Sequence, residues 1–275
     1  MPVTAPSLSA FLDAHAQVAK VEVTEAKGST PREAGTWMLV APAAIFGTIG
    51  GGQLEFMAID EARKMLRPSP RGAGPDEHSL LSIPLGPEIG QCCGGRVELS
   101  IRRVNDADRT TLVEVLAAAD ARLPAVLVFG GGHVGRALAQ ALALLPVRAR
   151  VVETRADAMD GFPPEVETRL TPMPEEQVRA AQPGTAFVVL THDHALDFLI
   201  VAEALRRGDA AYVGMIGSQT KKATLRSWFL KTAGGSDAEF SRLVSPIGGA
   251  AVRDKRPAVI AALAAAEIMT ALAQS

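Results

Sequence analysis

Cys92 and Cys93 stand side by side in the segment GPEIGQCCGGRVELS, residues 86–100, and no other thiol occurs in the 275-residue chain. A thiolate is a soft ligand and a nucleophile, so the pair could bind a soft metal ion or carry sulfur. Flanking glycines leave the backbone open to a bulky ligand. The alternative is two small buried side chains, because free cysteine is usually buried. A disulfide between neighbours would distort the peptide, and two thiols alone give poor support for zinc.

A second candidate site is the glycine pattern in VLVFGGGHVGRALAQAL, where Gly130, Gly132 and Gly135 follow an apolar run and precede a helical stretch. This spacing is typical of a dinucleotide-binding turn, in which free amides and the helix dipole attract a pyrophosphate. Glu153 ends the next apolar run, where an acid can accept hydrogen bonds from a ribose hydroxyl. The alternative is that the glycines only permit tight packing of strand and helix.

A third candidate is the segment VVLTHDHALD, in which His192, Asp193 and His194 follow another apolar run. Two histidines at the end of a strand are candidates for catalytic proton transfer. The alternative is an ordinary helix cap, with Asp193 or Thr191 accepting from free amides of the next helix.

A fourth candidate is the turn in VGMIGSQTKKATL, where Gly217 and Ser218 precede a helix that carries Lys221 and Lys222. Helix-start amides and lysines together predict an anion-binding site. A solvated basic turn is the equal alternative.

Two glycine-containing loops in the first half could also bind oxyanions through unhindered amides. The residues concerned are Ser29, Thr30 and Arg32 in GSTPREAG, and Gly50, Gly51 and Gly52 in GTIGGGQLEF. Taken singly, each loop is equally well explained as a plain turn.

The elements that position these residues fall into two halves. Residues 1–104 combine two helical segments with short β-type runs. This pattern predicts a small α+β domain that contains the cysteine pair. Residues 105–123 are predicted to be a connector. Residues 124–275 alternate apolar β-branched runs with helical stretches, which predicts a doubly wound parallel sheet of the Rossmann type. The expected fold class is therefore α/β.

Composition excludes several classes of function. The chain has 28 basic and 30 acidic residues, a formal net charge of −2, and so offers no excess of positive potential for nucleic acid. Neither a signal peptide nor a membrane span is evident, since the most apolar stretch, residues 258–273, is rich in alanine and contains Glu267. We therefore expect a cytoplasmic protein.

Taken together, the segments resemble those of the xanthine dehydrogenase accessory proteins, the XdhC/CoxI family. The resemblance spans residues 24–268 and rests on seven segments in the same order: GSTPREAG, GTIGGGQLE, QCCGGRVEL, FGGGHVGRALA, THDHALD, VGMIGS and LVSPIG. The chain departs from the family pattern after SPIG, where it reads GAAVRDKRP.

The resemblance implies a cofactor chaperone more than an enzyme. Such a protein would bind the molybdenum cofactor, molybdopterin, while a cysteine desulfurase or sulfurtransferase installs its sulfur, and would deliver it to an apo molybdenum hydroxylase of the xanthine dehydrogenase type. The resemblance assigns the metal end of the cofactor to Cys92 and Cys93. It places the glycines of the nucleotide motif at Gly130, Gly132 and Gly135.

Two other classes stay open at this point. One is an NAD(P)-dependent oxidoreductase that uses the glycine motif, Glu153 and the histidines. The other is a thiol redox or sulfur-transfer protein that uses the cysteine pair. We also expect a homodimer, because the alanine-rich segment 256–273 could offer a flat apolar face for self-association.

Overall fold

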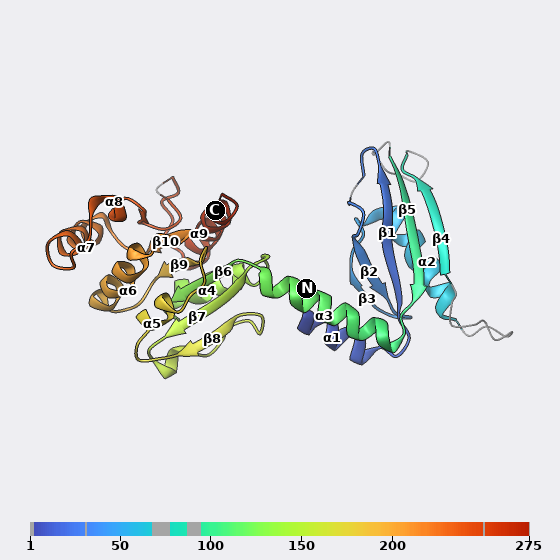
Figure 1. Ribbon diagram of the computed structural model, residues 1–275, viewed down its shortest axis with the longest axis horizontal. Helices are drawn as coiled ribbons and strands as arrows, with labels where there is room; N and C mark the ends of the chain where they lie inside the picture. The colour runs from blue at the N-terminus through green and yellow to red at the C-terminus, as the bar shows by residue number, and fades with distance from the viewer. Residues whose placement is uncertain (1–2, 31, 68–77, 87–94, 250, 275) are drawn as a thin grey trace. The chain divides into compact units, whose positions relative to one another are not determined.

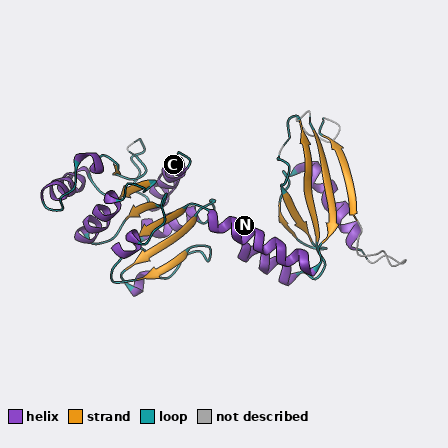
Figure 2. Ribbon diagram, viewed as in Figure 1, coloured by secondary structure: helices purple, strands orange, loops and turns teal. Residues whose placement is uncertain are grey.

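The computed structural model describes residues 3–30, 32–67, 78–86, 95–249 and 251–274. By its contacts the chain divides into two compact units, Val3–Ala119 and Asp120–Ser275, here called the amino-terminal and carboxy-terminal units. Figure 1 labels their elements along the chain, and Figure 2 shows that each unit combines helices with one sheet.

The amino-terminal unit is built on a five-stranded antiparallel sheet with strand order β3-β2-β1-β5-β4. Its helices pack on both faces, because the alternating strands bury apolar side chains against α2 in one core and against α1 and α3 in another. The elements are α1 (Ala5–Ala14), β1 (Ala19–Lys27), β2 (Trp37–Val40), β3 (Ile45–Gly47), α2 (Gly52–Leu66), β4 (His78–Pro84), β5 (Arg96–Arg103) and α3 (Asp106–Arg122).

The carboxy-terminal unit contains the predicted doubly wound sheet, with six parallel strands in the order β11-β10-β9-β6-β7-β8. Its strands are β6 (Ala125–Phe129), β7 (Arg148–Glu153), β8 (Glu167–Leu170), β9 (Ala186–Val189), β10 (Tyr212–Met215) and β11 (Leu243–Val244). Its helices are α4 (His133–Leu142), α5 (Glu175–Arg179), α6 (His194–Arg206), α7 (Gln219–Lys231), α8 (Asp237–Phe240) and α9 (Pro257–Leu272), with a 3-10 turn at Ala156–Ala158.

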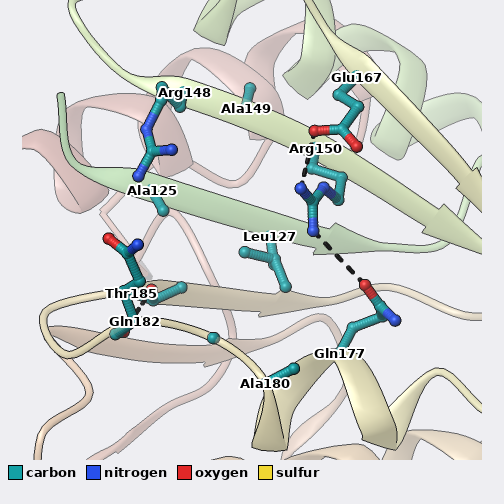
Figure 3. A pocket seen from close by; sticks show the side chains of 11 residues that line it. Ala125, Leu127, Arg148, Ala149, Arg150, Glu167, Gln177, Ala180, Gln182 and Thr185 are labelled. Atoms are coloured by element: carbon teal, nitrogen blue, oxygen red, sulfur yellow. Dashed lines mark hydrogen bonds and ion pairs between the residues drawn. The ribbon is translucent and has the colours of Figure 1, made fainter. Parts of the chain in front are cut away.

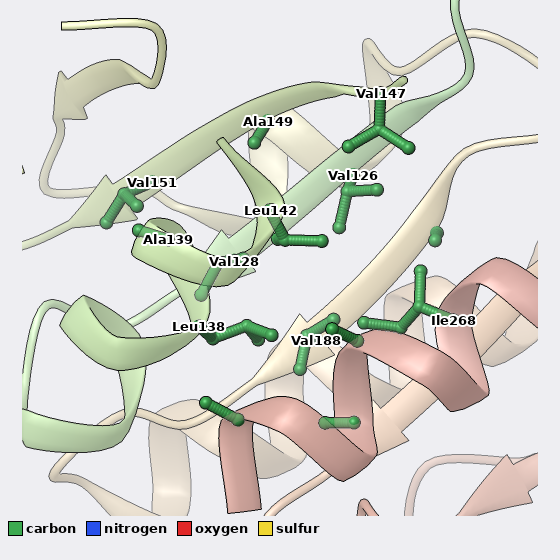
Figure 4. Packing of buried hydrophobic residues seen from close by; sticks show 14 of the residues in the cluster. Val126, Val128, Leu138, Ala139, Leu142, Val147, Ala149, Val151, Val188 and Ile268 are labelled. Atoms are coloured by element: carbon green, nitrogen blue, oxygen red, sulfur yellow. The ribbon is translucent and has the colours of Figure 1, made fainter. Parts of the chain in front are cut away.

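The central strands of this sheet are apolar on both faces, since each face is covered by helices. One core joins the sheet to α4 and α9 (Figure 4), and the other joins it to α6 and α7. The strand order reverses at β6: β7 and β8 lie on one side of it in the sheet, and β9, β10 and β11 lie on the other side. The carboxyl ends of β6 and β9 are therefore the switch point at which such sheets bind ligands.

The alanine-rich helix α9 has an apolar face inside this unit. Ala261, Ala264 and Ile268 are almost fully buried and belong to the core that α9 shares with α4. The apolar face that we expected to support self-association is thus already covered by the chain's own sheet and helix. The homodimer itself stays a prediction. Of the helices that the structure describes, none has both the length and the apolar character needed to cross a bilayer.

Candidate functional site

The carboxyl edge of the parallel sheet brings together segments that are far apart in the sequence. The glycine turn follows β6 and the THDH segment follows β9, its neighbour in the sheet. The two turns touch, because a Cβ atom on Gly130 would lie 2.5 Å from the Leu190 carbonyl oxygen. The candidate nucleotide motif and the candidate catalytic segment therefore share one edge, as the strand pattern predicts.

The glycines of the nucleotide motif have different structural roles. Gly130 has φ +119°, which favours glycine, and Gly135 packs so closely on the Gly130 carbonyl that a side chain there would clash with it. Gly132 is exposed, has φ −70°, and a Cβ built on it would meet no atom within 4 Å. Gly130 and Gly135 are thus needed by the fold, whereas Gly132 borders open space at the amino end of α4.

Glu153 accepts hydrogen bonds from the glycine turn and from the residues that follow β7. Its carboxylate is 3% exposed, and one oxygen accepts a hydrogen bond from the Gly131 N–H at 2.8 Å. The other oxygen accepts from the Thr154 N–H at 2.7 Å and the Arg155 N–H at 3.0 Å. The Arg155 guanidinium donates to the first oxygen at 3.2 Å. Both carboxylate oxygens are therefore engaged by the chain itself. A ribose-binding role for Glu153 stays a prediction, to which this arrangement lends no support.

The same contacts fix the charge of this carboxylate. Burial by itself would raise the pKa of Glu153, but the hydrogen bonds from the Arg155 side chain and from the N–H groups of Gly131, Thr154 and Arg155 outweigh it. Together they lower the pKa of Glu153 from 4.5 to about 2. The carboxylate is thus ionised at neutral pH and favours the folded state.

We expect Glu153 to make the stability of the carboxy-terminal unit depend on pH in acid. Because the folded pKa is below the unfolded value, its contribution is complete above pH 4.5 and is lost as pH falls toward about 2. Chemical unfolding between pH 6 and pH 2 should therefore show a loss that Glu153→Gln lacks, on the order of 2–3 kcal/mol. Glu165→Gln, at an exposed position nearby, is the matched control. Parallel pH profiles for wild type and Glu153→Gln would contradict this role.

In the THDH segment, Thr191 and Asp193 form hydrogen bonds within the chain, and the two histidines are exposed. Asp193 is the N-cap of α6, and its side chain accepts from the Ala195 N–H at 2.8 Å. His192 and His194 are exposed at the sheet edge. In the described part of the chain, no group of three or more His, Cys, Asp or Glu side chains is placed to bind a metal ion. The cap explanation accounts for Asp193, and a catalytic role for the histidines remains untested.

Sequence reasoning missed Asp197, which lies beneath this turn and is fully buried. One of its carboxylate oxygens accepts from the N–H of Thr191 at 3.0 Å and from the Thr191 hydroxyl at 2.7 Å. The other forms an ion pair with the Lys221 ammonium group, whose side chain is only 10% exposed. Asp197 thereby ties the turn after β9 to the first turn of α7. Its only sequence signal is an acid within an otherwise apolar helical face.

The predicted anion site at Gly217 and Ser218 has less free positive charge than its sequence suggests. Ser218 caps α7, with its hydroxyl accepting from the Lys221 N–H at 3.2 Å. Lys221 is neutralised by Asp197, and Lys222 reaches the carbonyl oxygens of β11 and the following residue at 3.4 and 3.3 Å. Both lysines therefore have partners within the chain, and anion binding here stays a prediction.

In the amino-terminal unit, three strands that precede predicted site segments end on the same side of the sheet. Strands β1, β3 and β4 run in the same direction, because antiparallel β2 and β5 lie between them. Their last residues, Lys27, Gly47 and Pro84, therefore lie at the same end of the sheet. Gly95 packs against the turn after β1, since a Cβ there would lie 2.6 Å from the Ser29 carbonyl oxygen. Cys92 and Cys93 lie outside the described residues.

The structure describes the other predicted oxyanion-binding residues of the amino-terminal unit. Ser29 and Arg32 are exposed and Thr30 is half-buried, so they are accessible at this end of the sheet. The triple-glycine loop has φ values of +122°, +76° and +67° at Gly50, Gly51 and Gly52, which explains its composition.

An internal carboxylate already fills the triple-glycine loop. One oxygen of Glu55 accepts from the Ile49 N–H at 3.1 Å and the Gly51 N–H at 3.2 Å, and also from the Thr48 hydroxyl. An external oxyanion would have to displace this side chain. Binding of a cofactor at Gly50–Gly52 thus stays a prediction with a competitor inside the chain.

Comparison with known proteins gives matches in both units. Residues 126–268 match the family described as the XdhC Rossmann domain, and residues 11–72 match the XdhC and CoxI family. The chain is 27% identical over 242 residues to the uncharacterized protein YqeB of Escherichia coli strain K12, covering 84% of this chain and 39% of that relative. This chain thus corresponds to less than half of YqeB.

A solved structure supports the fold along the whole chain. The crystal structure of a Bacillus halodurans protein, described as a xanthine dehydrogenase, superposes with a TM-score of 0.75 at 16% identity and covers 99% of this chain and 96% of that one. At this identity the likeness establishes the fold alone. The model of the XdhC Rossmann domain matches more than half of this chain, and the chain therefore belongs to the XdhC family.

Proposed function

We propose that this protein binds the molybdenum cofactor and passes it to a xanthine dehydrogenase-type molybdenum hydroxylase. The observation that carries the proposal is the open space above Gly132 at the switch point of the sheet, in a chain of the XdhC family. Backbone amides at the start of α4 recognise phosphate whatever is attached to it. The phosphate-bearing end of a pterin cofactor therefore suits this edge as well as a dinucleotide does.

The chemistry proposed for the amino-terminal unit concerns the metal end of the cargo. A thiolate of Cys92 or Cys93 suits molybdenum better than a hydroxyl does, because thiolates are soft ligands. Gly95, which follows the cysteine-containing segment in the sequence, packs against Ser29 in the turn after β1. Transfer of sulfur to the cargo by a cysteine desulfurase or sulfurtransferase, and transfer of the cargo to the apo hydroxylase, are parts of the same proposal.

The test is to co-express the full chain with an active cofactor pathway and identify the bound pterin and molybdenum after purification. We expect Cys92→Ser/Cys93→Ser to fold like the wild type, since the side chains are nearly isosteric. It should retain less than about a tenth of the molybdenum, because the hydroxyl is a harder ligand. Metal analysis and thermal unfolding of both proteins provide the measurement. Absence of pterin from the wild type, or unchanged molybdenum in the double variant, would overturn this reading.

The oxidoreductase alternative rests on one observation, the exposure of His192 and His194 at the edge that carries Gly132. It requires tight binding of NAD(P) and transfer of hydride, both of which can be measured on the purified chain. A persulfide on Cys92 or Cys93, found by mass spectrometry, would instead favour a sulfur-transfer protein. Light scattering at micromolar concentration tests the homodimer separately, and a monomer would leave the carrier proposal intact.

A further inference from the structure

A pocket of about 220 Å³ lies at the opposite edge of the parallel sheet from the glycine turn. It is formed where β6, β7, β8 and β9 begin, and its polar side chains come from Arg148, Arg150, Glu167, Gln177, Gln182 and Thr185. Small side chains of alanine on the surrounding elements leave the space between them open. Figure 3 shows the two arginine side chains extending from the same strand across this space. None of the site residues discussed above lines it.

The pocket carries more positive than negative charge. Glu167 is its only acid, and that carboxylate pairs with the Arg150 guanidinium at 2.8 Å. Arg148 is anchored because its Nε–H donates to the Leu123 carbonyl oxygen at 3.1 Å. Within the described part of the chain, no hydrogen bond is present for the other nitrogens of Arg148. The lining thus presents one uncompensated guanidinium, on an exposed side chain that one hydrogen bond through Nε–H anchors.

The pocket also has donors beyond Arg148. The Nε–H of Arg150 is shielded from solvent and has no hydrogen-bond partner among the described residues. The Gln177 side-chain oxygen contacts Arg150 at 3.5 Å, which turns its amide N–H groups away from that guanidinium. Because solvent does not reach the Arg150 Nε atom, it adds to the positive charge near the pocket but is not a donor that a ligand can contact.

The carbonyl groups at the end of α5 do not cancel this positive charge. Arg207 donates to the carbonyl oxygens of Val178 and Arg179 at 2.7 and 3.2 Å. The partial negative charge at the carboxyl end of α5 is therefore compensated from outside the pocket. The net positive charge of the lining therefore comes from Arg148, since Arg150 is paired with Glu167.

We infer that this pocket is a second binding site of the carboxy-terminal unit, for a small oxyanion such as a carboxylate or a phosphate. The Arg148 guanidinium supplies the paired donors that oxyanions require, and Gln182, which lines the same pocket, can add an amide donor. Glu167 acts as the internal competitor, since it occupies one face of Arg150. The site is separate from the cofactor edge and does not depend on the function proposed above.

The test is titration of the full-length ¹⁵N-labelled chain with inorganic phosphate and, separately, with malonate in a buffer of low chloride. NMR signals of the arginine Nε–H groups and of the Thr185 amide report on the pocket. We expect saturable shifts with at least one probe, which also tells phosphate from carboxylate recognition. Arg148→Met should weaken binding by about tenfold or more. Glu167→Gln should tighten binding severalfold, because it removes the competing negative charge and keeps the size of the side chain.

Controls separate this site from general charge effects and from the cofactor edge. Arg226→Met removes the same charge from an exposed side chain on α7 and should leave binding unchanged. Gly132→Val, at the other edge of the sheet, should leave the shifts of the Thr185 amide unchanged, even if it removes phosphate binding at the start of α4. The inference would be overturned if neither probe gave saturable shifts up to about 10 mM, a dissociation constant that corresponds to about 2.7 kcal/mol of binding free energy. Equal binding by wild type and Arg148→Met would do the same, as would weaker binding by Glu167→Gln.

Discussion

Replacing Gly132 by valine is expected to abolish binding of the pterin cofactor without unfolding the protein. The Gly132 backbone, at φ −70°, is accessible to any residue, and a Cβ there meets no protein atom within 4 Å. Because Gly132 is the N-cap of α4, where valine is disfavoured, stability should fall by only about 1 kcal/mol. The branched side chain would fill the space in which a phosphate approaches the amides of α4, so affinity for the cofactor should fall by about a hundredfold or more.

The matched control for this variant is Gly208→Val, at a glycine that also has open space around it but lies away from the glycine turn. Cofactor loading after co-expression and thermal unfolding should be measured on both variants. Gly135→Val serves as the opposite control, because that side chain would clash with the Gly130 carbonyl and should destabilise the unit. The three variants together separate ligand binding from folding.

The same variant decides between the carrier and the oxidoreductase. If Gly132→Val loses NAD(P) binding but still retains the pterin, the turn serves a nicotinamide, and the carrier proposal for this edge is wrong. His192 and His194 would then be the next residues to test for proton transfer.

Removing Asp197 is expected to cause a large loss of stability. Asp197→Ala leaves the Lys221 ammonium group, whose side chain is 10% exposed, without its carboxylate, and it leaves the Thr191 N–H without its acceptor. Breaking one partner out of a buried pair typically costs about 3–5 kcal/mol. Urea unfolding followed by far-UV circular dichroism would measure this cost.

Two companion variants test the physical cause. Asp197→Leu combined with Lys221→Met should recover most of the loss, because replacing both members of a buried pair removes the uncompensated charge. Asp237→Ala breaks the exposed pair between Asp237 and Arg226 and should cost about 1 kcal/mol or less. If Asp197→Ala unfolded at the wild-type urea concentration, the pair would not organise this edge of the sheet.

The architecture of the carboxy-terminal unit was predictable because its main signals are local. The apolar runs that became β6, β7, β9 and β10 are long enough to identify buried strands without knowledge of their neighbours. Strand β8 was missed because all four of its residues are exposed, and β11 because it has only two. Edge strands of these kinds carry no apolar pattern in the sequence.

The sequence by itself determined the four central strands of the parallel sheet and the glycine turn at its switch point, since each depends on residues close together along the chain. Only the tertiary structure decided how the charged residues are used. Asp197 meets Lys221 across 24 residues, and Glu153 meets the Gly131 amide across 22. Side chains predicted to face a ligand thus satisfy the chain's own amides and charges. The physical reason is that burial and hydrogen-bond partners are set by which loops converge at the sheet edge, and local composition does not encode that convergence.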